Sequence, residues 1–207
     1  MNLQDYLRAP CGVLSIPYWK AQTVQMPPHI RIVHHRDYDA AAWADWNDEP
    51  YFRLMHDLRS IAPAEGPFVC RVAAEADLPL IRELINRSYA DLAVGMKQLQ
   101  GYRTTPAFAA ELWLIALDAQ SGEPVGCGIA DIDPVAGEGA LEWIQVLPEH
   151  RRRGAGRFIV NSLLNRMAGR AAFATVSGQV NNITNPEGLY RRCGFTGSDV
   201  WHILKKR

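Results

Sequence analysis

The stretch that most constrains this chain runs from Leu141 to Met167, LEWIQVLPEHRRRGAGRFIVNSLLNRM. It begins with aliphatic and aromatic residues that are typical of a β-strand, and Pro148 ends that run. It finishes with apolar residues at Val160 and at the third, fourth and seventh positions after it, a spacing that predicts one buried face of a helix. The sequence therefore predicts a strand, a tight turn and a long helix in direct succession.

The turn itself is basic and rich in small residues, with the sequence Arg151-Arg152-Arg153-Gly154-Ala155-Gly156. Small residues let the backbone turn tightly and let a ligand approach it closely. The first amides of a helix have no partner inside the helix, and with the helix dipole they attract anions. The turn therefore predicts a phosphate or pyrophosphate site, although a Gly-x-Gly can be only a tight turn and three arginines only a solvated surface.

Two motifs carry a resemblance to a known family. The turn after the strand resembles the acetyl-CoA-binding motif of the GNAT superfamily of N-acetyltransferases, Arg/Gln-x-x-Gly-x-Gly/Ala after a strand that ends Val-x-Pro. Three positions fill this motif: Arg151, Gly154 and Gly156. The run from Asn185 to Phe195, NPEGLYRRCGF, resembles the closing motif of the family, an Asn-rich loop followed by Leu-Tyr and Gly-Phe. Gly188 departs from the Ala of many relatives, and we expect it to weaken the short helix slightly.

The resemblance covers roughly residues 68–206 and implies the fold class. We expect an α/β (α+β) fold with a GNAT-type mixed, mainly antiparallel sheet of about six or seven strands, flanked by helices and preceded by an N-terminal extension. The strands are expected at 68–73, 111–118, 125–133, 141–146, 172–177 and 196–204, and helices after 75–77, at 107–110, at the long amphipathic segment and around Leu189. In the family, the central strand and the strand after the long helix splay apart, and the pantetheine arm of the cofactor enters the gap.

The N-terminal part of the chain is harder to interpret. We expect residues 1–66 to form an extension packed on the acetyltransferase domain of residues 67–207, as an acceptor-side lid or as an extra strand and helices. A short helix is expected at LQDYL, a strand at 29–34, a short helix at 39–46, and another helix capped by Asn47 or Asp48 with Phe52, Met55 and Leu58 inward. Trp19, Trp43 and Trp46 either anchor the extension or line an acceptor pocket.

Composition excludes several classes of protein. Lys and Arg together number 22, as do Asp and Glu, so no overall charge draws the chain to nucleic acid or to an anionic membrane. The four cysteines are scattered without a Cys-x-x-Cys, which argues against a zinc site and for a reducing compartment. With no run resembling a signal peptide or a membrane span, we expect a cytoplasmic protein without a metal and without nucleic-acid or membrane partners.

The resemblance implies a cofactor, acetyl-CoA, and its binding residues. The diphosphate is expected at the backbone amides around 152–157, with charge from the arginines, and the pantetheine amides at the end of the central strand, which in relatives often bears a bulge. The residues assigned to the cofactor are Val146, Leu147, Pro148, Arg151, Arg152, Arg153, Gly154, Ala155, Gly156, Arg157 and Asn182. Asn181 and Asn185 are alternatives to Asn182, and all three can equally belong to a loop that caps the next helix.

Two residues are assigned to catalysis. Tyr190 aligns with the family tyrosine that donates a hydrogen bond or a proton to the leaving thiolate, although it can also be a packing residue. Glu142 lies on the central strand near the expected thioester and is the candidate base, acting directly or through water, unless it is a solvated carboxylate. His34 and His35 are further candidates for the base if the extension folds over the acceptor side, and Asp131 and Asp133 can attract an acceptor cation.

These residues favour an N-acetyltransferase that moves an acetyl group directly to a primary amine in a ternary complex. The alternative is a GNAT-fold regulatory module that binds acyl-CoA without turnover. A P-loop nucleotide hydrolase is excluded, because the sequence has no Gly-x₄-Gly-Lys-Ser/Thr. The acceptor, a small molecule or a peptide amine, cannot be inferred from the sequence, and the oligomeric state is equally open, a homodimer included.

Overall fold

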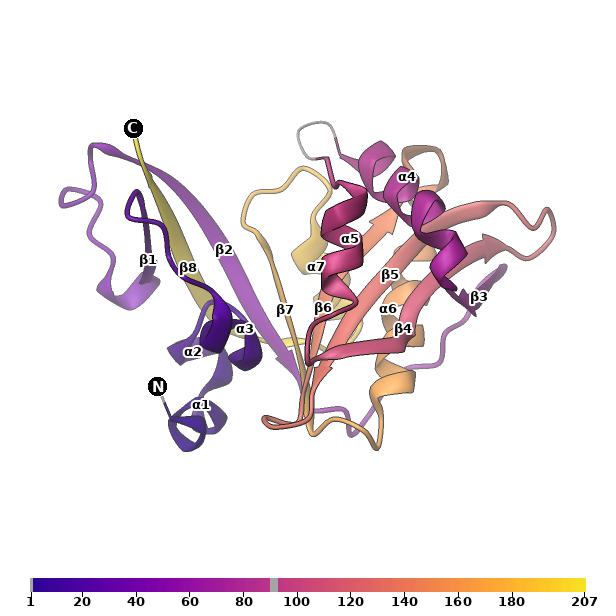
Figure 1. The fold of residues 1–207 in the computed structure, drawn as a ribbon, viewed down its shortest axis with the longest axis horizontal. Helices are drawn as coiled ribbons and strands as arrows, with labels where there is room; N and C mark the ends of the chain where they lie inside the picture. Colours follow the sequence, from indigo (N-terminus) through magenta and orange to yellow (C-terminus); the bar gives the residue numbers. More distant parts are fainter. Residues whose placement is uncertain (1, 90–92) are drawn as a thin grey trace.

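The computed structural model describes residues 2–89 and 93–207, and in these ranges one sheet of eight strands runs through the molecule (Figure 1). The strands are β1 (Ile30–His34), β2 (Trp46–His56), β3 (Phe68–Val72), β4 (Phe108–Asp118), β5 (Pro124–Asp133), β6 (Glu138–Val146), β7 (Phe173–Gln179) and β8 (Thr196–Lys206). Their order in the sheet is β1-β8-β2-β7-β6-β5-β4-β3. Only β6 and β7 pair in parallel among these strands, so the expected mixed, mainly antiparallel sheet is confirmed.

Helices lie on both faces of the sheet. They are α1 (Leu3–Arg8), α2 (Pro10–Val13), α3 (Tyr18–Thr23), α4 (Leu78–Ser88), α5 (Met96–Tyr102), α6 (Ala155–Met167) and α7 (Pro186–Arg192), with short 3-10 turns η1 (His35–Asp37), η2 (Glu75–Asp77) and η3 (Pro148–His150). Along β4, Leu114 packs into the cluster that contains α6, and its neighbours Trp113 and Ile115 pack into the cluster that contains α4 and α5. The nearly continuous apolar run of β4 follows from this burial on both faces.

The parallel pair opens partway along its length. The pairing of β6 with β7 starts at Glu138 opposite Phe173 and ends at Leu141 opposite Val176. Beyond that point β6 continues beside β5 alone, while β7 continues beside β2. The separation of the central strand from the strand after the long helix, which the family resemblance implies, is therefore present in this chain.

The largest difference from expectation lies in the N-terminal part. The two helices expected from residues 39 to about 61 are wrong, because residues 40–45 form turns and residues 46–56 form β2. Strand β2 pairs with β7 on one side and β8 on the other, and this adds a strand to the expected six or seven. Phe52 and Leu54 of β2 join the same buried cluster as Leu163 of α6. The spacing of Phe52 and Met55 is compatible with a helix, but pairing along both edges buries the segment as a strand, and this burial determined its structure.

A second difference concerns residues 96–110. The short helix expected at 107–110 is wrong, because Phe108 already begins β4, and the helix of this region lies earlier, at Met96–Tyr102. Strands β1, β3, β5, β6, β7 and β8 lie where the sequence predicts them, as do α1, α4, α6 and α7. None of the helices in the described ranges has the length and the apolar character needed to cross a membrane.

A buried ion pair ties the extension to the central strand. Arg53 of β2 donates from Nη2 to Glu138 Oε1 of β6 at 3.0 Å, and both side chains are buried. Glu138 also accepts a hydrogen bond from the Tyr18 amide of α3 at 3.0 Å, and Arg53 donates to the Tyr6 hydroxyl of α1 at 3.2 Å. The first helices of the chain are therefore held by hydrogen bonds against the side of the sheet where β6 and β7 meet.

Candidate active site

The start of α6 is shaped by two residues in the left-handed region. Gly154, the residue before the helix, has φ +92°, and Arg152 has φ +61°. A residue with a Cβ would be strained at the Gly154 angle, whereas glycine adopts it freely. Because the N-cap is a glycine, no side chain caps the first amides of α6.

The resulting loop presents a row of unpaired amides. The backbone N–H groups of residues 152–157 make no hydrogen bond to any group in the described ranges, and the first capped amide is that of Phe158, which donates to Gly154 O at 3.0 Å. These donors converge at the positive end of the helix dipole. An arrangement of this kind binds phosphate oxygens, so the residues present fit the diphosphate of a coenzyme A thioester.

The three consecutive arginines do different things. Arg151 ties the loop to its surroundings by donating to Val146 O at 3.2 Å and to Ser88 O at 2.8 Å. Arg153 pairs with Asp118 at the end of β4, with 3.0 Å between Nη2 and Oδ2. Arg152 and Arg157 are exposed, and neither has a side-chain hydrogen bond or ion pair among the residues that the structure describes. Of the expected arginines, these two have guanidinium groups that are free to meet an anion.

The open half of β6 supplies a second row of backbone groups. The Leu147 amide donates to Val125 O of β5 at 3.0 Å. Because amides alternate sides along a strand, those of Ile144 and Val146 face away from β5, toward the edge that β7 has left. The Val146 carbonyl is occupied by Arg151, but its amide is not. This edge can hydrogen-bond an extended amide-containing chain such as pantetheine.

Glu142 sits at the point where the two strands part. It is the extra residue of a bulge, since β5 pairs Ile129 with Trp143 and Ala130 with Leu141. The bulge interrupts the alternation from which its orientation was expected. Its side chain is 19% exposed, and its carboxylate forms an ion pair with Lys20 of α3. The structure thus brings the candidate base to the gap, together with a lysine that was not considered from the sequence.

A second carboxylate lies beside this pair. Asp131 of β5 is buried, and burial raises the pKa of its carboxyl group from 3.8 to about 7, with a further increase from the charge of Glu142 and an opposing effect of Lys20. Asp133 is used differently, because its Oδ1 accepts the amides of Val135 and Ala136 in the turn after β5. Asp131 and Asp133 were both considered for attracting a cation. Of the two, only Asp131 is affected by the charges of Glu142 and Lys20 at the gap.

Tyr190 of α7 is buried against aromatic rings. Its ring centroid lies 6.2 Å from that of Phe52 and 5.8 Å from that of Phe195. Burial raises the pKa of its phenol, so the hydroxyl stays protonated at neutral pH. The hydroxyl makes no hydrogen bond to another described residue, which leaves it available as a donor.

The asparagine loop before α7 is engaged in local hydrogen bonds. Asn185 is the N-cap of α7 and accepts from the Gly188 amide at 3.0 Å. Asn182 Oδ1 accepts from the amide and the hydroxyl of Thr184, at 2.9 and 2.7 Å. A Cβ on Gly188 would lie 2.9 Å from the Asn185 side-chain amide, so an alanine here would require the capping side chain to shift. The geometry shows the capping role that the sequence left open for this loop.

The histidines considered as bases lie elsewhere. His34 of β1 pairs with Asp199 at 3.0 Å, and His35 Nδ1 lies 2.9 Å from His202 Nε2. Both partners belong to β8, on the far side of β2 from the gap. The sequence reasoning missed Lys20, and it missed the hydrogen bond of 2.9 Å from Gln145 to the Tyr89 hydroxyl beside β6. Neither contact has a local sequence signal.

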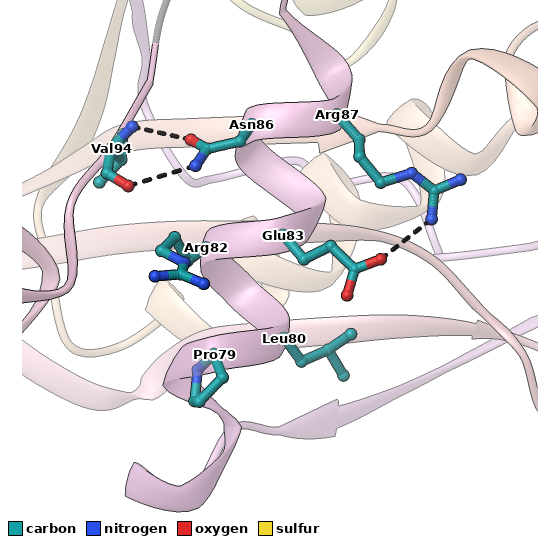
Figure 2. Close-up of a pocket in the computed structure, with 7 residues that line it drawn as sticks. All are labelled: Pro79, Leu80, Arg82, Glu83, Asn86, Arg87 and Val94. Carbon is teal, nitrogen blue, oxygen red and sulfur yellow. Dashed lines mark hydrogen bonds and ion pairs between the residues drawn. The ribbon is translucent and has the colours of Figure 1, made fainter.

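Two pockets lie near the elements described above. A small one of about 130 Å³ lies at the gap and is lined by Lys20, Glu142 and neighbours from β6, β7 and the extension. A second pocket, of about 540 Å³, lies along α4 and is lined by Pro79, Leu80, Arg82, Glu83, Asn86, Arg87 and Val94 (Figure 2). None of these seven residues was expected in the active site, so the small pocket is the relevant one. The described residues contain no cluster of three or more His, Cys, Asp or Glu side chains able to hold a metal.

Solved structures share this fold at low sequence identity. A GCN5-related N-acetyltransferase from Sphaerobacter thermophilus is 18% identical, with a TM-score of 0.69 over 86% of this chain and 58% of that one. The ribosomal-protein-S18-alanine N-acetyltransferase from Escherichia coli is 18% identical, with a TM-score of 0.52 over 66% of this chain and 91% of that one. This chain therefore spans little more than half the length of the Sphaerobacter protein.

The family is shown by the sequence itself. A search of curated proteins finds no match. The profile of the Acetyltransferase (GNAT) family matches residues 79–195, which is more than half of the chain and includes β6, the glycine turn, α6 and α7. Membership of this family implies the use of an acyl-CoA, in agreement with the free amides at α6. The chain belongs to the GNAT family of acetyltransferases.

Proposed function

We propose that this chain is an N-acetyltransferase that moves an acetyl group from acetyl-CoA to a primary amine by direct transfer in a ternary complex. The observation that carries the proposal is the row of unpaired amides at residues 152–157, placed beside the open edge of β6. Together they match the two polar parts of coenzyme A, a diphosphate and a chain with amides. Acetyl-CoA supplies a thioester carbonyl that an amine can attack.

The cofactor contacts follow from this placement. The backbone of Arg152, Arg153, Gly154, Ala155, Gly156 and Arg157 holds the diphosphate, with charge from Arg152 and Arg157. Arg151 positions the loop by holding the Val146 and Ser88 carbonyls. The segment Val146, Leu147 and Pro148 pairs with the pantetheine arm, and Asn182 contacts the cofactor through its side-chain NH₂.

The catalytic assignments rest on position and protonation. Glu142 accepts a proton from the amine, directly or through a water molecule, because its carboxylate lies where β6 and β7 part. Tyr190 donates a proton or a hydrogen bond to the leaving sulfur, and its raised phenol pKa supports a neutral donor. Holding both reactants in the gap supplies much of the rate enhancement through proximity.

Residues 1–66 form the acceptor-side cover of the domain at residues 67–207. The segment from Ser15 to Lys20 contributes to the small pocket at the gap, which supports this role. The acceptor is a small-molecule or peptide amine, and neither nucleic acid nor a membrane is a partner, as the zero formal charge supports. The association state is tested by light scattering, with a homodimer as one outcome.

The test is thiol release from acetyl-CoA across a panel of amines, run beside calorimetry with coenzyme A. We expect heat of binding and thiol release with at least one class of primary amine. Binding without thiol release from any amine would favour the non-catalytic acyl-CoA-binding module. Absence of coenzyme A binding would contradict both the acetyltransferase and the non-catalytic acyl-CoA-binding module. The variant Glu142→Gln separates the roles further, since it should lower turnover and leave the affinity for coenzyme A unchanged.

A further inference from the structure

The extension places one of its own lysines in the acceptor position. The Lys20 ammonium forms an ion pair with Glu142, the carboxylate proposed as the base, and the two side chains are 24% and 19% exposed. Glu142 directly follows Leu141, the last residue of β6 that pairs with β7. A primary ammonium therefore already occupies the site where an acceptor amine has to meet its base.

The surroundings of Lys20 are those of a site for a cation. Asp131, buried on the neighbouring strand, adds a second carboxyl group, and both Glu142 and Lys20 act on it. Two acidic groups and one ammonium thus act on one another near the point where β6 and β7 part. Ile16 and Pro17 from the extension and Ser177 of β7 also line the small pocket. Lys20 itself lines this pocket beside Glu142.

The extension is anchored to the sheet by other contacts as well. The Tyr18 amide, the Tyr6 hydroxyl and the Ser15 carbonyl are all held by the buried pair of Arg53 and Glu138. These contacts fasten α1 and α3 without the help of Lys20. The part-buried pair of Lys20 and Glu142 therefore joins an extension that other contacts already hold in place.

We propose that Lys20 is an intramolecular acceptor and that the chain acetylates its own Lys20 at Nζ. This inference rests on the proposed function. Glu142 removes a proton from the ammonium, and the Nζ lone pair attacks the thioester carbonyl. The new C–N bond forms as the C–S bond breaks. Of the two protons that nitrogen loses overall, one ends on the thiol of coenzyme A and one passes through Glu142 to water.

Acetylation changes the contact that holds the side chain. The product is a neutral amide, so the ion pair with Glu142 is lost and the carboxylate faces the gap without its cation. The structure therefore assigns to Lys20 both the substrate class of the site, a lysine-type primary ammonium, and a modification site within the extension.

The chain offers a clear internal comparison, because it has only four lysines, Lys20, Lys97, Lys205 and Lys206. The full-length protein is incubated with acetyl-CoA, and acetylation is followed by intact mass and by peptide mapping. We expect one acetyl group per chain, located on Lys20, with a first-order rate constant that does not change with protein concentration. Lys97, which is exposed on α5, should react only at the rate of uncatalysed chemical acetylation.

Variants separate the enzymatic reaction from chemical labelling. Lys20→Arg keeps the positive charge and should abolish the single acetyl group, whereas the matched Lys97→Arg should leave it unchanged. Glu142→Gln, with its fold checked by circular dichroism, should slow labelling of Lys20 by at least tenfold. Equal labelling of Lys20 and Lys97, or a rate that rises with protein concentration, overturns the inference. Thiol release with external amines while Lys20 stays unmodified overturns it too, but leaves the proposed function standing; absence of any coenzyme A binding removes both.

Discussion

The ring of Tyr190 in α7 packs 6.2 Å from the ring of Phe52 in β2, so a strand from the N-terminal part of the chain supports the proposed proton donor. Phe52 is also buried against Gly178 of β7, where an added Cβ would lie 2.5 Å from its ring. The position of the tyrosine therefore depends on β2 as well as on α7. This contact connects the extension to the chemistry of the gap.

Replacing Tyr190 with Phe removes the hydroxyl and keeps the packing. We expect the turnover number to fall by about 10²-fold, the lower end of what a positioned acid contributes, while the affinity for coenzyme A is unchanged. Steady-state thiol release and calorimetry measure the two quantities. The matched control is Tyr38→Phe, because Tyr38 stacks on His202 away from the gap and its loss should not change turnover. Full activity of the Tyr190 variant would show that another group protonates the sulfur.

Removing the charge of Arg152 or Arg157 should weaken coenzyme A binding. Each contact of a charged donor with phosphate is worth about 1.5 kcal/mol, so each alanine variant should raise the Kd by roughly tenfold, and less at high salt. Calorimetry at two salt concentrations tests this. Arg59→Ala, at an exposed position outside the loop, provides the control for loss of a positive charge. If both loop variants bind as tightly as the parent, the diphosphate lies elsewhere.

The buried pair of Arg53 and Glu138 predicts a pattern of stability. Arg53→Met leaves the Glu138 carboxylate buried without its cation and should lower the free energy of unfolding by about 3–5 kcal/mol. The double variant Arg53→Met with Glu138→Leu removes both charges and should lose much less. Urea denaturation of the parent, both single variants and the double variant gives the comparison. Additive losses in the double variant would contradict a coupled pair.

Asp131 predicts a loss of stability as the pH rises. Its carboxyl pKa is about 7 in the folded chain against 3.8 ordinarily, so the folded state binds more protons than the unfolded state between these values. Stability from this group is therefore present below about pH 4 and is lost as the pH approaches 7. The variant Asp131→Asn should not show that loss. The difference in free energy of unfolding between variant and parent should therefore be roughly 1–3 kcal/mol more favourable to the variant at pH 8 than at pH 5. Urea denaturation at the two pH values measures the gain, and an equal difference at both would exclude a raised pKa.

Local patterns were sufficient where one segment contains all the interactions that matter. The strand, glycine turn and helix from Leu141 to Met167 were predicted correctly, because the apolar spacing and the turn residues act within a few positions of each other. The unpaired amides at the turn follow from the same local chemistry, since a glycine N-cap offers no side chain to cover them. The position of Tyr190 in a short helix was likewise predicted from its own motif.

Other features depend on partners that are distant along the chain. The spacing of Phe52 and Met55 fits a helix as well as a strand, and only pairing with β7 and β8 makes the segment a strand. Arg151 and Arg153 look equivalent in the sequence, yet one holds the end of β6 and the other pairs with Asp118. No local rule distinguishes them, because their partners lie on other elements.

The order of residues alone specified the family motif, the helix start with its unpaired amides and the short helix that carries Tyr190, because each is built from neighbours in the chain. Tertiary structure decided which groups share the gap. Lys20 and Glu142 are 122 positions apart, and only the folding of the extension against β6 brings the ammonium to the carboxylate. Burial and charge pairing across such separations depend on the packed molecule, and the arrangement of charged groups at the gap is therefore determined by the fold.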